Sequence, residues 1–406
     1  MASNGKSPRD AVILGAARIP QGKLLGSLTP FTAVQLGQIA VQAAIERSGI
    51  DSTNVDEVIV GQVLSAGNGQ AVPRQISIGA GIPPHVGGFA LNKVCGSSLK
   101  TAMIAAGLIR IGDGDLYISA GAESMTNAPF LNLKGRSGNK YGHVELKDAI
   151  LWDGLWDHVE DWVMGEAAEF IADHYEITRA EMDEFAVRSH QLAHEATQAG
   201  RFQDEIVPVE IKGRKGKVTV FEHDESIRPD TNMDALAGLR PAFLADGRVT
   251  AGNAPGLNDG AAAVVLASRA YAETHGHQPM ARVVGYGQAA VEPKWLFAAP
   301  IKAVPAALDR AGWTVDDVDL FELNEAFAAQ VLADLKGLEQ DGHPVPLEKL
   351  NVNGGAIAIG HPIGASGARV LVTLIYALQQ RGLKRGVAAL CLGGGEAVAM
   401  AVELES

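Results

Sequence analysis

The strongest constraint on the fold of this chain is an internal repeat. The run Glu46–Val58 matches the run Asp309–Phe321 without a gap, and both contain an arginine, a glycine two residues later and then a Val-Asp pair. Similar patterns of apolar and glycine residues precede and follow both runs. A repeat built of mixed strands and helices predicts two similar domains that arose by duplication.

Each copy of the repeat has the same predicted order of elements. Apolar strands alternate with amphipathic helices that end at glycine. The matching elements are strands 11–15 and 281–287, helices 34–48 and 301–311, strands 56–62 and 316–322, helices opening at 95–98 and 364–367, and strands 116–121 and 387–392. This order predicts an α/β protein with two largely parallel sheets, covered by helices and facing each other across a pseudo-twofold axis.

One matching pair of loops contains the most unusual sequence of the chain. The glycine-rich run Asn351–Arg369 contains His361 and leads into a helix N-terminus, and its counterpart Asn92–Ser98 contains Cys95. A nucleotide loop is rejected because neither G-x-x-x-x-G-K-[ST] nor G-x-G-x-x-G can be read in it. Two hypotheses remain at this point: tight packing between two elements, or a catalytic histidine that a substrate approaches closely.

The composition argues against several functional classes. The chain has 406 residues, 47% of them hydrophobic, and a net charge of −13. No apolar run approaches the roughly 20 residues that span a bilayer, and no basic stripe is concentrated enough for nucleic acid. The two cysteines lie far apart, so no structural disulfide is expected. We therefore expect a cytoplasmic protein that binds neither membranes nor nucleic acid.

The segment between the copies, Glu123–Asn253, differs from them in composition and is predicted to be an insertion that covers the site. It contains three tryptophans among acidic residues and a long helical stretch, Met164–Gly200. His190 and His194 are one helical turn apart, but no glutamate follows His190, so no metal site is predicted. Insertions of this length often carry binding or assembly functions.

Four side chains supply a reactive constellation. Cys95 and His361 lie near helix N-termini, where the helix field and a neighbouring imidazole are expected to lower the pKa of the thiol. Cys391 ends a strand before three glycines, whose N–H groups can face an oxyanion. Asn324 follows the strand that ends at Leu323. Alone, each residue is compatible with a packing role, but together they indicate covalent acyl transfer.

These segments resemble the signatures of the thiolase family. The similar runs are Asn92–Leu99, Thr250–Ala261, Asn324–Phe327, Asn353–Gly367 and Cys391–Gly395. The resemblance extends from about Val12 to Met400. It implies a duplicated, five-layered α-β-α-β-α fold with an inserted loop domain. The implied division is residues 1–122 with 254–275 as the N-terminal half, 123–253 as the loop domain and 276–406 as the C-terminal half.

The resemblance also implies roles for the reactive residues. Cys95 takes the acyl group of acyl-CoA, His361 activates it, and Cys391 removes a proton from the α-carbon of acetyl-CoA in a Claisen condensation or its reverse, thiolysis. His361 and Asn324, through a water, hold one thioester oxygen. The backbone N–H groups of Cys95 and Gly393 hold the oxygen of the acyl group that is bound to Cys95.

Coenzyme A is then a substrate and product, and no tightly bound cofactor or metal is expected. The implied contacts with its pantetheine and nucleotide parts are Leu155, Met164, Arg228, Phe243, Ala251 and Phe327. The chain departs from the family at Val163, Pro255 and Lys294–Phe297, where a histidine, a serine and a glycine-containing run are common. These departures put two polar contacts and the shape of the acyl pocket in question.

The resemblance implies a homo-oligomer, either a dimer or a tetramer of dimers, that acts on acetyl-CoA and acyl-CoA. Two other functions stay open from the sequence. One is a non-catalytic subunit that binds acyl-CoA, and the other is a ketosynthase that uses carrier-protein substrates.

Overall fold

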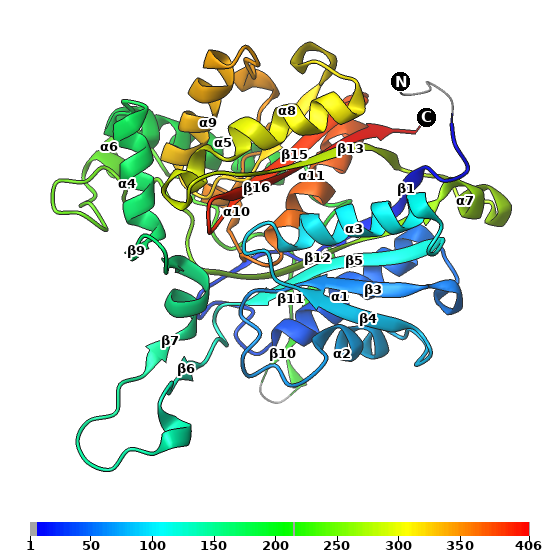
Figure 1. Cartoon of the computed structure of the whole chain (residues 1–406), viewed down its shortest axis with the longest axis horizontal. Helices are drawn as coiled ribbons and strands as arrows, with labels where there is room; N and C mark the ends of the chain where they lie inside the picture. Colours follow the sequence, from blue (N-terminus) through cyan, green and yellow to red (C-terminus); the bar gives the residue numbers. More distant parts are fainter. Residues whose placement is uncertain (1–5, 214–215, 406) are drawn as a thin grey trace.

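One large sheet organises the molecule (Figure 1). The computed structural model describes residues 6–213 and 216–405. Within these residues the strand order is β14-β15-β16-β13-β1-β12-β5-β3-β4, and the short strand β2 (Gly22–Lys23) pairs with β12. The other strands are β1 (Ala11–Arg18), β3 (Glu57–Gly61), β4 (Gly87–Leu91), β5 (Leu116–Ser124), β12 (Asn258–Ser268), β13 (Ala281–Ala290), β14 (Leu320–Leu323), β15 (Arg385–Leu392) and β16 (Glu396–Leu404).

The sheet consists of two equivalent halves, one from each copy of the repeat. Strands β4-β3-β5-β12-β1 form the first half and β14-β15-β16-β13 form the second, so matching strands take matching places. The halves join where β1 and β13 run antiparallel, with Val12 opposite Arg282 and Ile13 opposite Ala281. This arrangement confirms the duplication predicted from the sequence.

Matching glycines let a helix approach the sheet closely in each half. A Cβ atom on Gly15 in β1 would lie 2.6 Å from the carbonyl oxygen of Ala44, and one on Gly285 in β13 would lie 2.8 Å from that of Ala307. Both glycines follow a register shift in their strand. Since Ala44 and Ala307 are themselves equivalent in the repeat, the same contact has been kept in both copies.

The prediction of largely parallel sheets was wrong. Only β3 with β4, β3 with β5 and β14 with β15 run parallel among the described strands of this sheet. Strands β12 and β16, which the sequence reading did not recognise, run antiparallel to both of their neighbours. The three glycines Gly393–Gly395 reverse the chain between β15 and β16, and Gly394 and Gly395 have φ angles of 82° and 84° that favour glycine.

Helices cover both faces of each half-sheet and produce the five layers that we expected. Helices α3 (Ser97–Ile111) and α11 (Ser366–Arg381) pack between the half-sheets, in a core to which both halves contribute. Helices α1 (Ala33–Ser48) and α2 (Val72–Gly79) cover the first half, and α8 (Pro300–Ala311) and α9 (Ala328–Gln340) cover the second (Figure 1). Every residue of β1, β5 and β12 is therefore buried.

The stretch Val94–Ile111 has the length and hydropathy of a membrane span, with a mean hydropathy of 1.3 over 18 residues. Our expectation that no apolar run approaches that length was therefore too strong. The helix in this stretch is α3, which lies in the central layer and packs against α11. Its apolar composition is explained by its position between two sheets.

The segment between the copies forms small elements beside the sheet, and its β6-β7 hairpin projects from the body (Figure 1). Its elements are β6 (Phe130–Leu131), η2 (Gly135–Ser137), β7 (Lys147–Asp148), the π-helical turn η3 (Ile150–Leu155), β8 (Trp156–Asp157), β9 (Trp162–Val163), α4 (Met164–His174), α5 (Arg179–Gln198), β10 (Val209–Lys212), β11 (Val218–Phe221) and α6 (Met233–Ala237). The remaining short helices are η1 (Ser52–Asn54), α7 (Arg269–His275), η5 (Pro293–Ala298), η6 (Val315–Asp317), η7 (Leu347–Lys349) and α10 (Ala356–Ile359).

The long helical stretch predicted at Met164–Gly200 is two helices, α4 and α5. The chain turns at Glu176, whose φ angle is 51°. Thr178 then caps α5: its hydroxyl oxygen accepts the N–H of Glu181, and the Glu181 carboxylate accepts the N–H of Thr178. This capping box starts a new helix because it satisfies N–H groups that a continuous helix would have paired.

The close packing of α11 on α3 depends on Gly367. A Cβ atom there would collide with the backbone nitrogen of Leu99 and lie 2.9 Å from its Cβ. We predict that Gly367→Ala destabilises the protein by about 1–3 kcal/mol through overpacking, measured as a lower Tm in thermal unfolding.

Gly107→Ala is the matched control, because a Cβ on this α3 residue would meet only the end of the Tyr286 side chain, at 3.3 Å. Alanine also favours a helix interior by about 0.5–1 kcal/mol over glycine. An equal fall in Tm for both variants would contradict the packing argument.

Candidate active site

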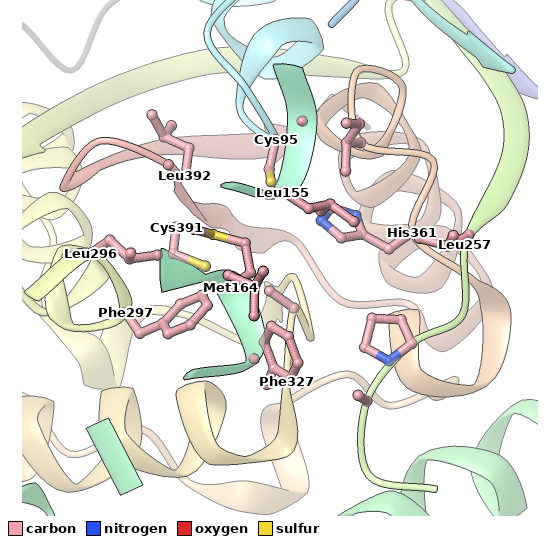
Figure 2. A pocket seen from close by; sticks show the side chains of 18 of the residues that line it. Cys95, Leu155, Met164, Leu257, Leu296, Phe297, Phe327, His361, Cys391 and Leu392 are labelled. Atoms are coloured by element: carbon pink, nitrogen blue, oxygen red, sulfur yellow. The ribbon is translucent and has the colours of Figure 1, made fainter. Parts of the chain in front are cut away.

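Three of the predicted catalytic side chains meet in a cavity of about 190 Å³. Cys95, His361 and Cys391 all line it, and Figure 2 shows their side chains converging on the same space. The other lining residues are glycines or carry apolar side chains, and they come from both halves and from the inserted segment. The three predicted reactive groups are thus the ionisable groups of the cavity wall.

A strained turn presents Cys95 just before α3. Val94 has a φ angle of 44°, which is unusual for a β-branched residue. The Ser97 hydroxyl donates to the Val94 carbonyl at 2.6 Å and accepts the N–H of Lys93 at 2.8 Å. These bonds hold the turn against its strain, and strain of this kind tends to persist at functional sites.

The His361 loop is held by polar groups that are themselves buried. The carboxylate of Glu325 accepts the N–H of Ile357 at 3.1 Å, and that of Glu123 accepts the N–H of Gly364 at 3.0 Å. Between these two points, the Asn258 Oδ1 atom accepts the N–H of His361 itself at 2.9 Å. The sequence reading assigned no role to these three residues, although a charged or amide residue at the end of an apolar strand is a usable signal.

The two loops correspond, but Cys95 and His361 do not occupy equivalent positions. Isolated bridges link Lys93 to Cys95 in one loop and Val352 to Gly354 in the other, so Gly354 is the counterpart of Cys95. His361 lies in the extra segment 355–365 of the second loop, between this counterpart and α11. The second copy therefore contributes its histidine through an insertion that the first copy lacks.

The hydrogen bonds around the imidazole define its tautomer. The Ser366 hydroxyl lies 3.0 Å from the carbonyl oxygen of Pro362, which can only accept, so the hydroxyl donates there. The Ser366 oxygen then accepts the Nδ1–H of His361 at 2.6 Å. This leaves a lone pair on Nε2, the state that a general base requires. Ser366 is a further residue that the sequence reading missed.

Asn324 lies beside the imidazole and does not line the cavity. Its Nδ2 group is 3.5 Å from His361 Nε2, and its side chain is fully buried. The predicted proximity of Asn324 and His361 is present, with the amide directed at the nitrogen that carries the lone pair.

The charge states differ from those expected for a nucleophile at a helix N-terminus. Burial, together with the nearby Glu123 carboxylate, raises the pKa of the Cys95 thiol to about 12. Burial, followed by the positive charge of Arg369, lowers the pKa of His361 to about 3. Thiol and imidazole are therefore both neutral in the ligand-free protein. The lowered thiol pKa that we expected from the sequence is not found.

Cys391 faces the same cavity from the end of β15 (Figure 2). Burial and the proximity of Cys95 raise the pKa of its thiol well above the usual range. Gly393, two residues later, also lines the cavity, and its role as an oxyanion donor stays a prediction. A Cβ atom on Gly393 would lie 3.4 Å from the side chain of Val94, the residue before the nucleophile.

The residues predicted to contact coenzyme A fall into two groups. Leu155, Met164, Phe243 and Phe327 line the cavity. Arg228 and Ala251 do not line it; they are exposed, and the Arg228 guanidinium donates to the Ala251 carbonyl at 3.2 Å.

Four residues at which the chain departs from the family also line the cavity: Val163, Pro255, Leu296 and Phe297. They add apolar surface and no side-chain hydrogen-bond donor. Phe297 packs edge-on against Phe327 with ring centroids 5.4 Å apart.

Two family models match the chain. The model of the thiolase N-terminal domain matches residues 11–270, and that of the thiolase C-terminal domain matches residues 277–404. Together they cover the two half-sheets and the segment inserted between them.

Relatives and solved structures agree with these models. An acetyl-CoA acetyltransferase of Cupriavidus necator is 49% identical over 394 residues, which are 97% of this chain and 99% of the relative. One of Syntrophomonas wolfei is 50% identical over 397 residues, with the same shares. The crystal structure of the Bacillus anthracis acetyl-CoA acetyltransferase is similar with a TM-score of 0.94 and 42% identity, over 99% of this chain and 100% of that one. The structure of acetyl-CoA acetyltransferase from Syntrophomonas wolfei is similar with a TM-score of 0.96 and 40% identity, over 98% of this chain and 99% of that one.

The neutral state of the cysteine and histidine pair is testable in solution. Because the pKa of Cys95 is raised to about 12, its thiolate fraction is small throughout the range near neutral pH. We predict no ultraviolet thiolate absorbance from Cys95 between about pH 6 and pH 9, where an ordinary thiol titrates. The measurement is the difference spectrum between the ligand-free protein and its Cys95→Ser variant, repeated with Cys391→Ala as background. A thiolate signal at neutral pH that His361→Ala removes would show an ion pair instead.

Proposed function

This chain belongs to the thiolase family, and on that premise we propose that it is an acetyl-CoA C-acyltransferase that works through an acyl-Cys95 intermediate. The reaction is the condensation of acyl-CoA with acetyl-CoA, or the reverse thiolysis of 3-oxoacyl-CoA. The observation that carries the proposal is the meeting of two thiols and one imidazole in an otherwise apolar cavity. Such a cavity excludes water, which would otherwise hydrolyse an acyl-enzyme.

In the first half-reaction, the Cys95 sulfur attacks the thioester carbonyl while His361 Nε2 accepts the thiol proton. The S–C bond to coenzyme A breaks, and its thiolate takes a proton from Cys391. The low pKa of His361, about 3, means that the imidazolium exists only within the reaction sequence. Its positive charge in turn stabilises the Cys391 thiolate that remains.

In the second half-reaction, the Cys391 thiolate removes a proton from the α-carbon of acetyl-CoA. The resulting carbanion attacks the carbonyl of the acyl group on Cys95, and the C–S bond to Cys95 breaks. The Cys95 thiolate then recovers its proton from the His361 imidazolium. All three groups return to their neutral states, which are the states that burial favours.

Two oxygen sites support these steps in the proposal. The oxygen of acetyl-CoA lies against the Nε2–H of the imidazolium, with Asn324 reaching it through a water. The oxygen of the acyl group on Cys95 faces the backbone N–H groups of Cys95 and Gly393. Fixed donors of this kind stabilise charge that develops during the reaction.

The substrate that we propose first is acetoacetyl-CoA, supported by the relatives named acetyl-CoA acetyltransferase. The pantetheine arm passes Leu155, Met164, Phe243 and Phe327, and an exposed Arg228 meets the nucleotide end. Because Val163 and Pro255 offer no side-chain hydrogen bond, polar groups of the arm bind backbone groups or water there.

The two alternatives are less consistent with the cavity. A subunit that only binds acyl-CoA has no use for a nucleophile and a base placed together. A ketosynthase is expected to have two histidines and no second cysteine, whereas this cavity has one histidine and two thiols in its lining. Turnover of acyl-CoA compared with acyl-carrier protein distinguishes the ketosynthase from the thiolase.

We also propose a cytoplasmic homo-oligomer, either a dimer or a tetramer of dimers. Both cysteines are free thiols, as in a reducing compartment. Strand β4 is the open edge of the large sheet and is half-exposed, and open edges favour pairing with a second copy. The division into residues 1–122 with 254–275, 123–253 and 276–406 remains our proposal for the domains.

The two thiols have different roles, so their variants should fail differently. We predict that Cys95→Ser and Cys391→Ala each lower kcat for thiolysis by about 100-fold or more, measured as CoA-dependent loss of the acetoacetyl-CoA enolate signal. Cys391→Ala should still accumulate an acetyl group on Cys95 from acetyl-CoA, detected by mass spectrometry, because the nucleophile and His361 remain.

The control for the mass measurement is the Cys95→Ser variant, which should trap no thioester. Wild-type protein that binds acetyl-CoA but neither becomes acylated nor turns over would support the non-catalytic alternative. Acylation of Cys391 in place of Cys95 would overturn the assignment of the nucleophile.

A further inference from the structure

We propose that Arg369 is a positioning residue for the acyl transfer, because its guanidinium holds the Asn324 amide in the orientation that directs an N–H donor at His361. The inference rests on the proposed function, in which Asn324 and His361 hold the oxygen of acetyl-CoA. Arg369 does not contact the cavity and acts through Asn324.

The orientation follows from the chemistry of the three groups. Arg369 Nη2 lies 3.3 Å from Asn324 Oδ1. A guanidinium can only donate, so the amide atom that faces it must be the oxygen. The amide nitrogen is then the atom 3.5 Å from His361 Nε2. Rotating the amide by half a turn would place two donors together at Arg369 and two acceptors together at Nε2.

This hydrogen bond also extends the chain that defines the tautomer of His361. One end is Arg369, which can only donate, and the other is the Pro362 carbonyl, which can only accept. Asn324, His361 and Ser366 lie between these ends, so each donates in the same direction. The lone pair on Nε2 is therefore specified from both sides, by Ser366 and by Asn324.

The other contacts of Arg369 are too few to explain it as a stabilising residue. It is 1% exposed, and its closest carboxylate is 3.5 Å away, on Glu322. Its Nε and Nη1 atoms have no hydrogen-bond acceptor within residues 6–213 and 216–405. Burying a guanidinium with incomplete partners opposes the stability of the fold. The buried position of Arg369 therefore needs a reason other than stability.

Arg18 shows what a fully paired buried arginine looks like in the same protein. Its guanidinium binds both oxygens of Asp224, at 2.7 and 2.8 Å, and Glu205 at 2.6 Å. Bidentate pairing of this kind offsets the cost of burial. The difference between the two arginines supports a functional reason for the placement of Arg369.

The positive charge of Arg369 is consistent with its place beside Asn324 and His361. After burial, it is the second cause of the lowered pKa of His361, so the guanidinium is electrostatically close to the imidazole.

The test compares the two half-reactions in Arg369→Met. Because Asn324 acts on the oxygen of acetyl-CoA, we expect kcat for acetoacetyl-CoA thiolysis to fall about tenfold to 100-fold, the cost of a misplaced hydrogen-bond donor. Acylation of Cys95 by acetyl-CoA, measured by rapid-quench mass spectrometry, should change by less than about threefold. Arg369→Lys keeps a charge and a donor, so it should retain more kcat than Arg369→Met.

A double-mutant cycle with Asn324→Ala tests whether Arg369 acts through the amide. We expect Arg369→Met to lower kcat by less than about threefold in the Asn324→Ala background, because the oriented group is already missing. The inference is overturned if the two substitutions lower kcat by independent factors that multiply. It is also overturned if Arg369→Met lowers the rates of both half-reactions equally.

Arg18→Lys is the matched control for damage to a buried arginine. It should lower the Tm while leaving the ratio of the two half-reaction rates unchanged. Wild-type protein without thiolysis activity would refute the proposed function itself. Active wild-type protein with unchanged kcat in both Arg369 variants would refute only the role of Arg369.

Discussion

The site depends on hydrogen bonds between backbone N–H groups of the His361 loop and two buried carboxylates. Glu325 accepts from the start of the loop and Glu123 from its end. Glu325 follows β14 and Glu123 lies near the end of β5, so the two carboxylates belong to different half-sheets. A glycine-rich loop has high conformational entropy, so it needs such anchors to hold one conformation. The carboxylates thereby transmit the rigidity of both half-sheets to the imidazole, while the nucleophile is held in the turn that precedes α3.

Much of the fold could be predicted because it is repeated. The match between residues 46–58 and 309–321 predicted two equivalent domains, and the matching contacts of Gly15 and Gly285 show why both copies kept the pattern. The direction of the strands could not be read in the same way. A strand buried on both faces is an apolar run whether its neighbours are parallel or antiparallel, so β12 and β16 left no distinctive signal.

The candidate site was predicted to a similar extent. The cavity contains Cys95, His361 and Cys391 together, whereas Arg228 and Ala251 lie outside it. Motif reading identifies groups that react, but not the groups that orient them. Their orientation depends on donors and acceptors that meet only in three dimensions. The charge state of Cys95 was also mispredicted, because the helix field was considered without the cost of burying a thiolate.

The place of β12 and β16 within their half-sheets bears on how the protein is made. Each is the last strand of its half in chain order, yet each lies between two earlier strands. On the ribosome, the first half-sheet stays open until the inserted segment and β12 have been translated, and the second until β16 has been translated. Cys391 lies in β15, the strand that joins β16 through the turn Gly393–Gly395, so the second thiol belongs to the part of the sheet that is completed last. Both half-sheets therefore close only when these late strands are in place.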